Sequence, residues 1–173
     1  MRPRVELLAD VRQRVQIGTE HAVRVRDHGR AAPDLGVDAE LVDQAATEAG
    51  RIDKSDPALP QALIAVANAL KVIDATRVWD ATFDAVKAAN SAEGFSGEDG
   101  EIVLKFQTKS QSSVHNSDVP EFNLEGIFKD LANQDYDRAV ELARGFQAEG
   151  PRAIATIAIA RAVLEPKKAA AKR

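Results

Sequence analysis

The stretch Ile64-Ala-Val-Ala-Asn-Ala-Leu70 has a close counterpart in Ile157-Ala-Ile-Ala-Arg-Ala-Val163. In both, alanine occupies every second position, and a larger apolar residue begins and ends the run. Alanine has the highest helix propensity of all residues and is depleted in strands. Small side chains on successive turns also let a helix approach its neighbours closely. The two stretches therefore predict closely packed α-helices.

The composition of the whole chain agrees with this prediction. Of 173 residues, 45% are hydrophobic, 31 are alanine and only eight are aromatic. This length is typical of one domain with a substantial core, and the apolar content excludes a disordered chain. We therefore expect a mostly all-α, soluble fold in a single domain over residues 1–165.

Apolar residues recur at helical spacing in seven segments, which turn or capping residues separate. Asp38, Asp56, Asp74, Asn123 and Asp135 each precede one of these segments and are candidate N-caps. The segments expected to be helical are residues 4–28, 38–50, 57–72, 75–92, 124–133, 136–148 and 151–165.

Residues 94–122 differ from the rest of the chain in their pattern. Ile102, Leu104 and Phe106 alternate with other residues, which predicts a strand near residues 101–108. A polar tract follows and is predicted to be a loop. We therefore expect one small strand or hairpin as an insertion between helices. The basic residues 166–173 are expected to be disordered, as is common at a chain end.

A second pattern also recurs. Asp74-Ala-Thr-Arg-Val-Trp-Asp80 and Asp135-Tyr-Asp-Arg-Ala-Val-Glu141 share the form Asp-x-x-Arg-x-x-acidic, in which the aspartate is suited to cap a helix. Each recurring segment lies beside an alanine-rich one, so the chain contains two similar helix pairs. Helix pairs that cannot bury both faces alone must stack. We expect antiparallel helical hairpins stacked as a short α-solenoid of about seven helices.

These segments resemble a known class of protein. Asn133-Gln-Asp-Tyr-Asp-Arg-Ala-Val-Glu-Leu-Ala143 resembles the opening helix of a tetratricopeptide-type repeat, although the Trp…Leu-Gly…Tyr signature of that repeat is absent. Residues 150–164 are similar to the second helices of alanine-rich helical arrays of bacterial proteins. The resemblance covers residues 56–93 and 123–165. It implies an α-solenoid that acts as a scaffold or interaction module.

Charge and hydropathy point to neither nucleic acid nor membrane. The net charge is −4, and residues 31–135 carry eight basic and 19 acidic residues. The arginines of the first expected helix spread around its axis, whereas phosphate binding requires a basic stripe on one face. The chain has no apolar run of the ~18 residues that a membrane span requires. We therefore expect no nucleic-acid partner and no membrane span.

Motifs that carry catalytic or metal chemistry are not found. The chain has no cysteine, which excludes disulfides, thiolate zinc sites and a cysteine nucleophile. His21 and His28 lie ~10 Å apart on the expected first helix, too far apart to bind one metal. Ser112, Ser113, His115 and Asp118 share one polar tract, but it has no nucleophile elbow and no glycine-built oxyanion hole. We therefore expect no enzyme activity, no catalytic residue, no metal and no cofactor.

The last expected helix points to a partner. From Ala153 to Leu164 only Thr156 and Arg161 are polar, so the helix is apolar on nearly all sides. A helix of this kind needs neighbours around most of its surface. Either an earlier helix folds back to cover it, or another chain does. We expect contacts with a protein partner or with a second copy of the chain through Ile154, Ile157, Arg161 and Leu164.

Three functions follow as hypotheses. The first is a non-enzymatic helical-repeat scaffold for protein–protein interaction or self-association. The second is a carrier of a small molecule or lipid, with an inter-helix pocket gated by residues 94–122 and an apolar cavity under Phe95, Phe106 and Phe122. The third is a non-catalytic subunit of an enzyme complex. The first residues lack a secretory pattern, which favours the cytoplasm, or the periplasm if the chain is a fragment.

Overall fold

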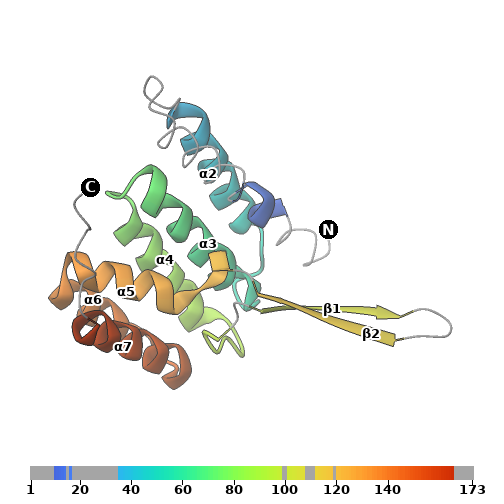
Figure 1. Ribbon diagram of the computed structural model, residues 1–173. Helices are drawn as coiled ribbons and strands as arrows, with labels where there is room; N and C mark the ends of the chain where they lie inside the picture. The colour runs from blue at the N-terminus through green and yellow to red at the C-terminus, as the bar shows by residue number, and fades with distance from the viewer. Residues whose placement is uncertain are drawn as a thin grey trace, which may run out of the picture.

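Helix α3 (Ala58–Ile73) lies centrally in the fold, and several other helices pack against it (Figure 1). The computed structural model describes residues 10–14, 16, 35–98, 101–107, 112–118 and 120–165. Helices predominate among these residues, so the predicted mostly helical fold is confirmed. The neighbours of α3 are α2 (Leu35–Ala49), α4 (Val78–Ser91), the short 3-10 helix η1 (Pro120–Phe122) and α5 (Leu124–Gln134).

The alanine-rich stretch explains why α3 can be central. The consecutive residues Ile64, Ala65, Val66 and Ala67 are all buried, so neighbours cover every side of the helix over this turn. Small side chains at alternate positions reduce the distance to those neighbours, and the larger residues fill the space between them. The sequence pattern that predicts close packing is therefore found at the centre of the core.

Two further helices extend the fold on the far side of α5 (Figure 1). Helix α6 (Tyr136–Arg144) and helix α7 (Glu149–Leu164) both pack against α5 and against each other. The ring centroids of Phe128 and Phe146 lie 5.8 Å apart in the core beneath them. An exposed ion pair joins Lys129 of α5 to Glu165, the residue after α7. The hydrogen bond from the ammonium of Lys129 lowers the pKa of the Glu165 carboxyl.

Strand β1 (Glu101–Gln107) pairs antiparallel with strand β2 (Ser112–Asp118), and the hairpin points away from the helices (Figure 1). The prediction that the polar tract forms a loop is therefore wrong for residues 112–118. Pairing to β1 satisfies the backbone groups of this segment that face β1, and such pairing does not require apolar side chains. Helix η1 then returns the chain to the core, where Asn68 of α3 donates to the carbonyl oxygen of Glu121 over 2.8 Å.

Two of the predicted helix caps are present. The side chain of Asn123 accepts from the backbone N–H of Gly126 over 2.9 Å, and Asp135 accepts from that of Arg138 over 3.1 Å. Asp56 lies one residue before the N-cap of α3, Pro57, and accepts from the backbone N–H of Ala58 over 2.8 Å. In each case a short polar side chain binds an amide that has no partner inside the helix.

Two other predicted caps are wrong. Asp74 ends α3, and its carboxylate accepts from the backbone N–H and the hydroxyl of Thr76 over 3.1 and 2.6 Å. These bonds lower the pKa of Asp74 and form a turn, so α4 begins at Val78 rather than at residue 75. Asp38 lies inside α2, which begins at Leu35, because Gly36 can adopt a helical backbone at a cost of only ~1 kcal/mol relative to alanine.

The structure describes only part of the predicted N-terminal helix. Residues 10–14 and 16 are helical, and the rest of the expected helix 4–28 lies outside the described residues. Val11 is buried in the core, and the guanidinium of Arg14 donates to the side chain of Gln44 of α2 over 2.5 Å. This segment and α2 therefore lie on the α3 side of the fold, away from α7 (Figure 1).

The two recurring patterns occur in opposite order in the two helix pairs. The alanine-rich helix comes first in α3–α4 and second in α6–α7. The two helices that follow the aspartates of the Asp-x-x-Arg pattern, α4 and α6, face each other. Within the described ranges, no helix combines the length and apolar character needed to cross a membrane.

The loop before the hairpin gives a first prediction. Gly97 has a φ of 80°, and a Cβ there would lie 2.9 Å from Leu124 Cδ2 and 3.0 Å from Pro151 Cα. Gly97→Ala should cost about 1–2 kcal/mol for the left-handed backbone and a further ~1–3 kcal/mol for overpacking. Gly94, with a φ of 74° and open space around it, is the matched control. Urea unfolding of both alanine variants should show the larger loss for Gly97, and equal losses would contradict this packing.

Candidate functional site

The four residues predicted to contact a partner do not form one exposed patch. Ile157 and Leu164 of α7 are 52% and 80% exposed, whereas Ile154 packs against the core. The guanidinium of Arg161 donates to the carboxylate of Glu125 on α5. Part of the apolar surface of α7 nevertheless remains open.

Four of the exposed apolar residues of α7 are regularly spaced. Ala153, Ile157, Ala160 and Leu164 are separated by four, three and four positions and lie opposite the buried face of the helix, whereas the exposed Val163 lies outside this row. A hollow of about 410 Å³ lies beside Ala153 and Ile157 on this face. This spacing is the pattern of a helix-pairing seam.

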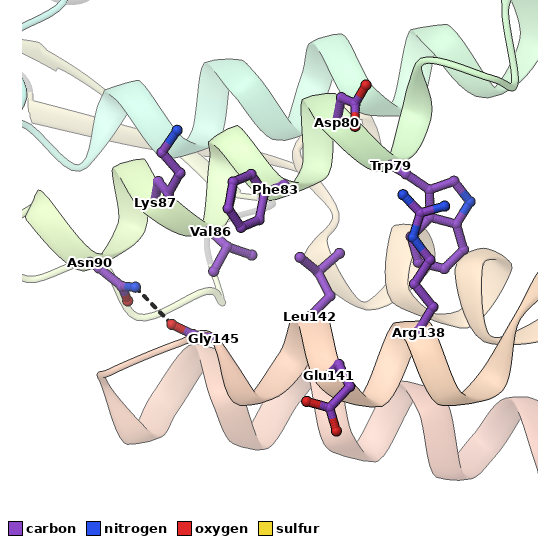
Figure 2. Close-up of a pocket in the computed structure, with 10 residues that line it drawn as sticks. All are labelled: Trp79, Asp80, Phe83, Val86, Lys87, Asn90, Arg138, Glu141, Leu142 and Gly145. Carbon is purple, nitrogen blue, oxygen red and sulfur yellow. Dashed lines mark hydrogen bonds between the residues drawn. The ribbon is translucent and has the colours of Figure 1, made fainter.

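A deeper groove lies between α4 and α6 and encloses about 330 Å³ (Figure 2). Its centre is apolar, and charged side chains stand at its edges. The lining residues are Trp79, Asp80, Phe83, Val86, Lys87 and Asn90 of α4, Arg138, Glu141 and Leu142 of α6, and Gly145 after it.

The floor of this groove consists of the apolar stripe of α4 and one residue of α6. Trp79 and Val86 are buried, and Leu142 lies between them on the opposite helix (Figure 2). Phe83, one turn from Trp79, is 53% exposed. The ring of Phe83 therefore forms an apolar wall that solvent reaches.

The aromatic residues at helical spacing in α4, in α6 and in the segment after α6 are not all buried. Trp79 and Phe146 are buried, but Phe83 and Tyr136 are 53% and 51% exposed. Phe83 has the helical spacing of a core residue. It remains exposed because no described side chain covers its outer edge.

Two cations stand against the aromatic rings of the groove. The guanidinium carbon of Arg138 lies 4.3 Å from the centroid of the Trp79 ring, and the ammonium of Lys87 lies 5.1 Å from that of Phe83. Attraction between a cation and the face of an aromatic ring holds both side chains in place. Lys87 also forms an ion pair with Asp84 at 3.1 Å, on the surface of α4.

Arg138 is not neutralised within the described part of the chain. None of the ion pairs there includes it, and the carboxylates of Asp80 and Glu141 point away from the space between the helices (Figure 2). Glu141 instead pairs with Arg144 at 2.5 Å. Arg138 therefore presents N–H donors at the edge of an apolar groove.

The equivalent arginine of the other pattern behaves differently. Arg77 donates to the carboxylate of Asp43 on α2 over 2.6 Å, and this hydrogen bond raises its pKa. Asp43 thus satisfies Arg77 internally, whereas Arg138 stacks on Trp79 with its donors free of carboxylate partners among the described residues.

Asn90 closes one end of the groove. Its amide nitrogen donates to the carbonyl oxygen of Gly145 over 2.7 Å (Figure 2), and its amide oxygen accepts from the backbone N–H of Gln147 over 2.8 Å. The carbonyl oxygen of Gly145 and the N–H of Gln147 therefore form hydrogen bonds to α4 instead of the bonds that would extend α6. For this reason α6 ends at Arg144, and the predicted helix over 136–148 is four residues too long.

Helix α7 begins at Glu149, before the predicted start at residue 151. Pro151 fits there because the first amides of a helix have no partner inside it. A hollow of about 320 Å³ beside this helix is lined by Gly97 and Glu98, from the segment predicted to gate a pocket, and by residues of α5 and α7. The hypothesis of a gated pocket stays a prediction, and Phe95 and Phe122, expected to line its cavity, are buried in the core.

The residues considered for metal or hydrolase chemistry can be placed only in part. His21 and His28 lie outside the described residues, and Ser112, Ser113, His115 and Asp118 lie on β2. Among the described residues, no three or more histidine, aspartate or glutamate side chains gather as a metal site would require.

The two hydrogen bonds of Asn90 predict that this side chain stabilises the contact between α4 and the end of α6. Asn90→Ala removes bonds to two backbone groups and should lower the free energy of unfolding by about 1–2 kcal/mol. Asn133 also bonds through its side-chain amide, to the carbonyl oxygen of Lys129, but this exposed bond stays within one helix, α5. Asn133→Ala should stay within about 0.5 kcal/mol of the wild type. Thermal unfolding compares the two variants, and equal losses would contradict the role of Asn90 as a tertiary clamp.

Comparison with known proteins identifies no relative. No protein-family model, no curated protein and no solved structure matches the chain. Function must therefore be inferred from the groove, the α7 face and their chemistry.

Proposed function

We propose that the chain is a non-enzymatic helical scaffold that binds another protein through the groove between α4 and α6. One observation carries the proposal: the half-exposed ring of Phe83 stands over an apolar floor, between two cations held on aromatic rings. Exposed apolar surface rimmed by polar groups is typical of interaction sites. Aromatic residues and arginine are enriched among the residues that contribute most binding energy.

The arrangement of the helices supports a scaffold. In the proposed α-solenoid, the hairpins α3–α4 and α6–α7 stack so that α4 and α6 meet along the groove. Solenoids bind partners along extended surfaces formed by successive repeats. A tetratricopeptide-like role, which the sequence resemblance implies, belongs to this proposal.

The open shape of the groove favours a protein segment over an enclosed lipid. The half-exposed Phe83 shows that solvent reaches one wall of this space of about 330 Å³. A pocket that buries a small molecule covers most of the surface of that molecule. The groove can accept one or two apolar side chains of a partner while the backbone of that partner stays outside.

This proposal can be tested with displayed peptides. Random peptides of about 12 residues, which span ~18 Å as helices, are selected on the immobilised full chain. Peptides that the wild type selects should bind Phe83→Glu at least ~30-fold more weakly, as expected for a central contact residue. Tyr136→Glu is the matched control, because Tyr136 is 51% exposed but does not line the groove. If neither variant affects binding, or both do equally, the groove is not the binding site.

Self-association through α7 is a second candidate, favoured by the spacing of its exposed residues. When two copies of the seam pair antiparallel, Ala153 faces Leu164 and Ile157 faces Ala160, so a small residue meets a large one in each layer. The four seam positions carry no charge, and the hollow beside Ala153 lies where Leu164 of the second copy would insert.

The seam is one helix long, ~24 Å, so the pairing should be weak. Sedimentation over a concentration series should show reversible dimerisation that Ile157→Glu abolishes. Gln147→Glu adds the same charge at an exposed position before the helix and should leave dimerisation unchanged. A monomer at all concentrations would exclude this candidate without affecting the groove.

A further inference from the structure

We propose that the partner of the groove is an acidic apolar protein segment, whose carboxylate binds Arg138 and whose apolar side chain packs between Phe83, Val86 and Leu142. This inference rests on the proposed function, because it assumes that the groove binds protein. It adds the chemical class of the partner.

The first step concerns the geometry of Arg138. Its guanidinium lies over the Trp79 ring at 4.3 Å, and its backbone N–H donates to the capping carboxylate of Asp135. A guanidinium held against an aromatic face retains N–H donors that fit the two oxygens of a carboxylate. The side chain is therefore already placed for an anion, so little conformational entropy is lost when one binds.

The second step concerns the charges around Arg138. The two carboxylates that line the groove do not bind Arg138: Glu141 pairs with Arg144, and Asp80 points away from the groove (Figure 2). Arg77, at the equivalent position of the other pattern, is neutralised by Asp43. The structure thus supplies one of these two arginines with a carboxylate, and leaves the other for a carboxylate from outside the described residues.

The third step sets the spacing in the partner. Phe83 lies one helical turn from Trp79, and Lys87 lies one turn further along α4. One turn corresponds to ~5.4 Å. An apolar side chain beside Phe83 would therefore have Arg138, over Trp79, one turn away, whereas Lys87 already pairs with Asp84. On a helical partner, residues three or four positions apart share a face. The complementary segment carries an acidic residue three or four positions before or after a leucine or an aromatic residue.

A fatty acid shares part of this chemistry, since it also combines a carboxylate with an apolar chain. Its long apolar chain would need to be covered, whereas the apolar wall of the groove at Phe83 is 53% exposed. The observations therefore favour a protein segment, and the lipid becomes an outcome of the test.

The experiment selects random displayed peptides in parallel on the full-length wild type, on Arg138→Gln and on Arg138→Glu. Wild-type selections should be enriched in peptides with aspartate or glutamate three or four positions from a leucine or aromatic residue. Arg138→Gln should lose this enrichment and bind the wild-type peptides about tenfold more weakly. Arg138→Glu should select lysine or arginine at the same spacing. Arg51→Gln is the matched control, because Arg51 is an exposed arginine that pairs with Glu48 away from the groove and should not alter selection.

The outcomes separate the two proposals. If peptides bind in a manner that depends on Phe83 but show no acidic enrichment, or keep it in Arg138→Gln, the partner class is wrong and the binding groove remains. If no peptide binding depends on Phe83, both proposals are wrong. Trp79, the sole tryptophan of the chain, reports ligands in solution. If sodium laurate below its micelle concentration changes Trp79 emission in an Arg138-dependent manner and no selected peptide does, the ligand is a lipid carboxylate and the protein-segment proposal is overturned.

Discussion

Close packing around α3 is the constraint on which the rest of the structure depends. Alanines at alternate positions allow α2, α4, α5 and η1 to approach this one helix. Once the inner face of α4 is committed to α3, its remaining apolar residues, Trp79, Phe83 and Val86, face the shorter helix α6. Helix α6 ends at Arg144 and contributes only Leu142 to the apolar floor, so the contact between the two helices is incomplete. The groove is therefore a consequence of how the core is built.

Local signals in the sequence predict local structure well. The helical spacing of apolar residues identifies the helical segments, and Asn123 and Asp135 cap their helices as expected, because the donor and acceptor lie within three residues of each other. Asp74 shows the limit of this reasoning. The same residue type also forms a turn with Thr76, and one sequence cannot decide which of the two local arrangements is adopted.

The degree to which a helical residue is buried could not be predicted from the spacing of apolar residues. Ile64 and Ile157 begin the same alternating pattern, yet Ile64 is 2% exposed and Ile157 is 52% exposed. The pattern specifies a helix with small residues, whereas burial depends on which other elements pack on it. Likewise, the bond from Asn90 to Gly145 spans 55 residues, and the Trp79–Arg138 contact joins two different helices. The groove combines such contacts, so the core spacing of Phe83 gave no sign of its exposure.

The location of the binding surface can be measured directly by heteronuclear NMR of the full chain, titrated with a peptide selected on it. Binding in the groove predicts the largest shift changes at the indole N–H of Trp79 and at the amides of Lys87 and Leu142, with little change on α7. Shift changes that cluster instead at Ile157, Val163 and Leu164 would contradict a groove-binding scaffold and would place the interaction on the exposed face of α7.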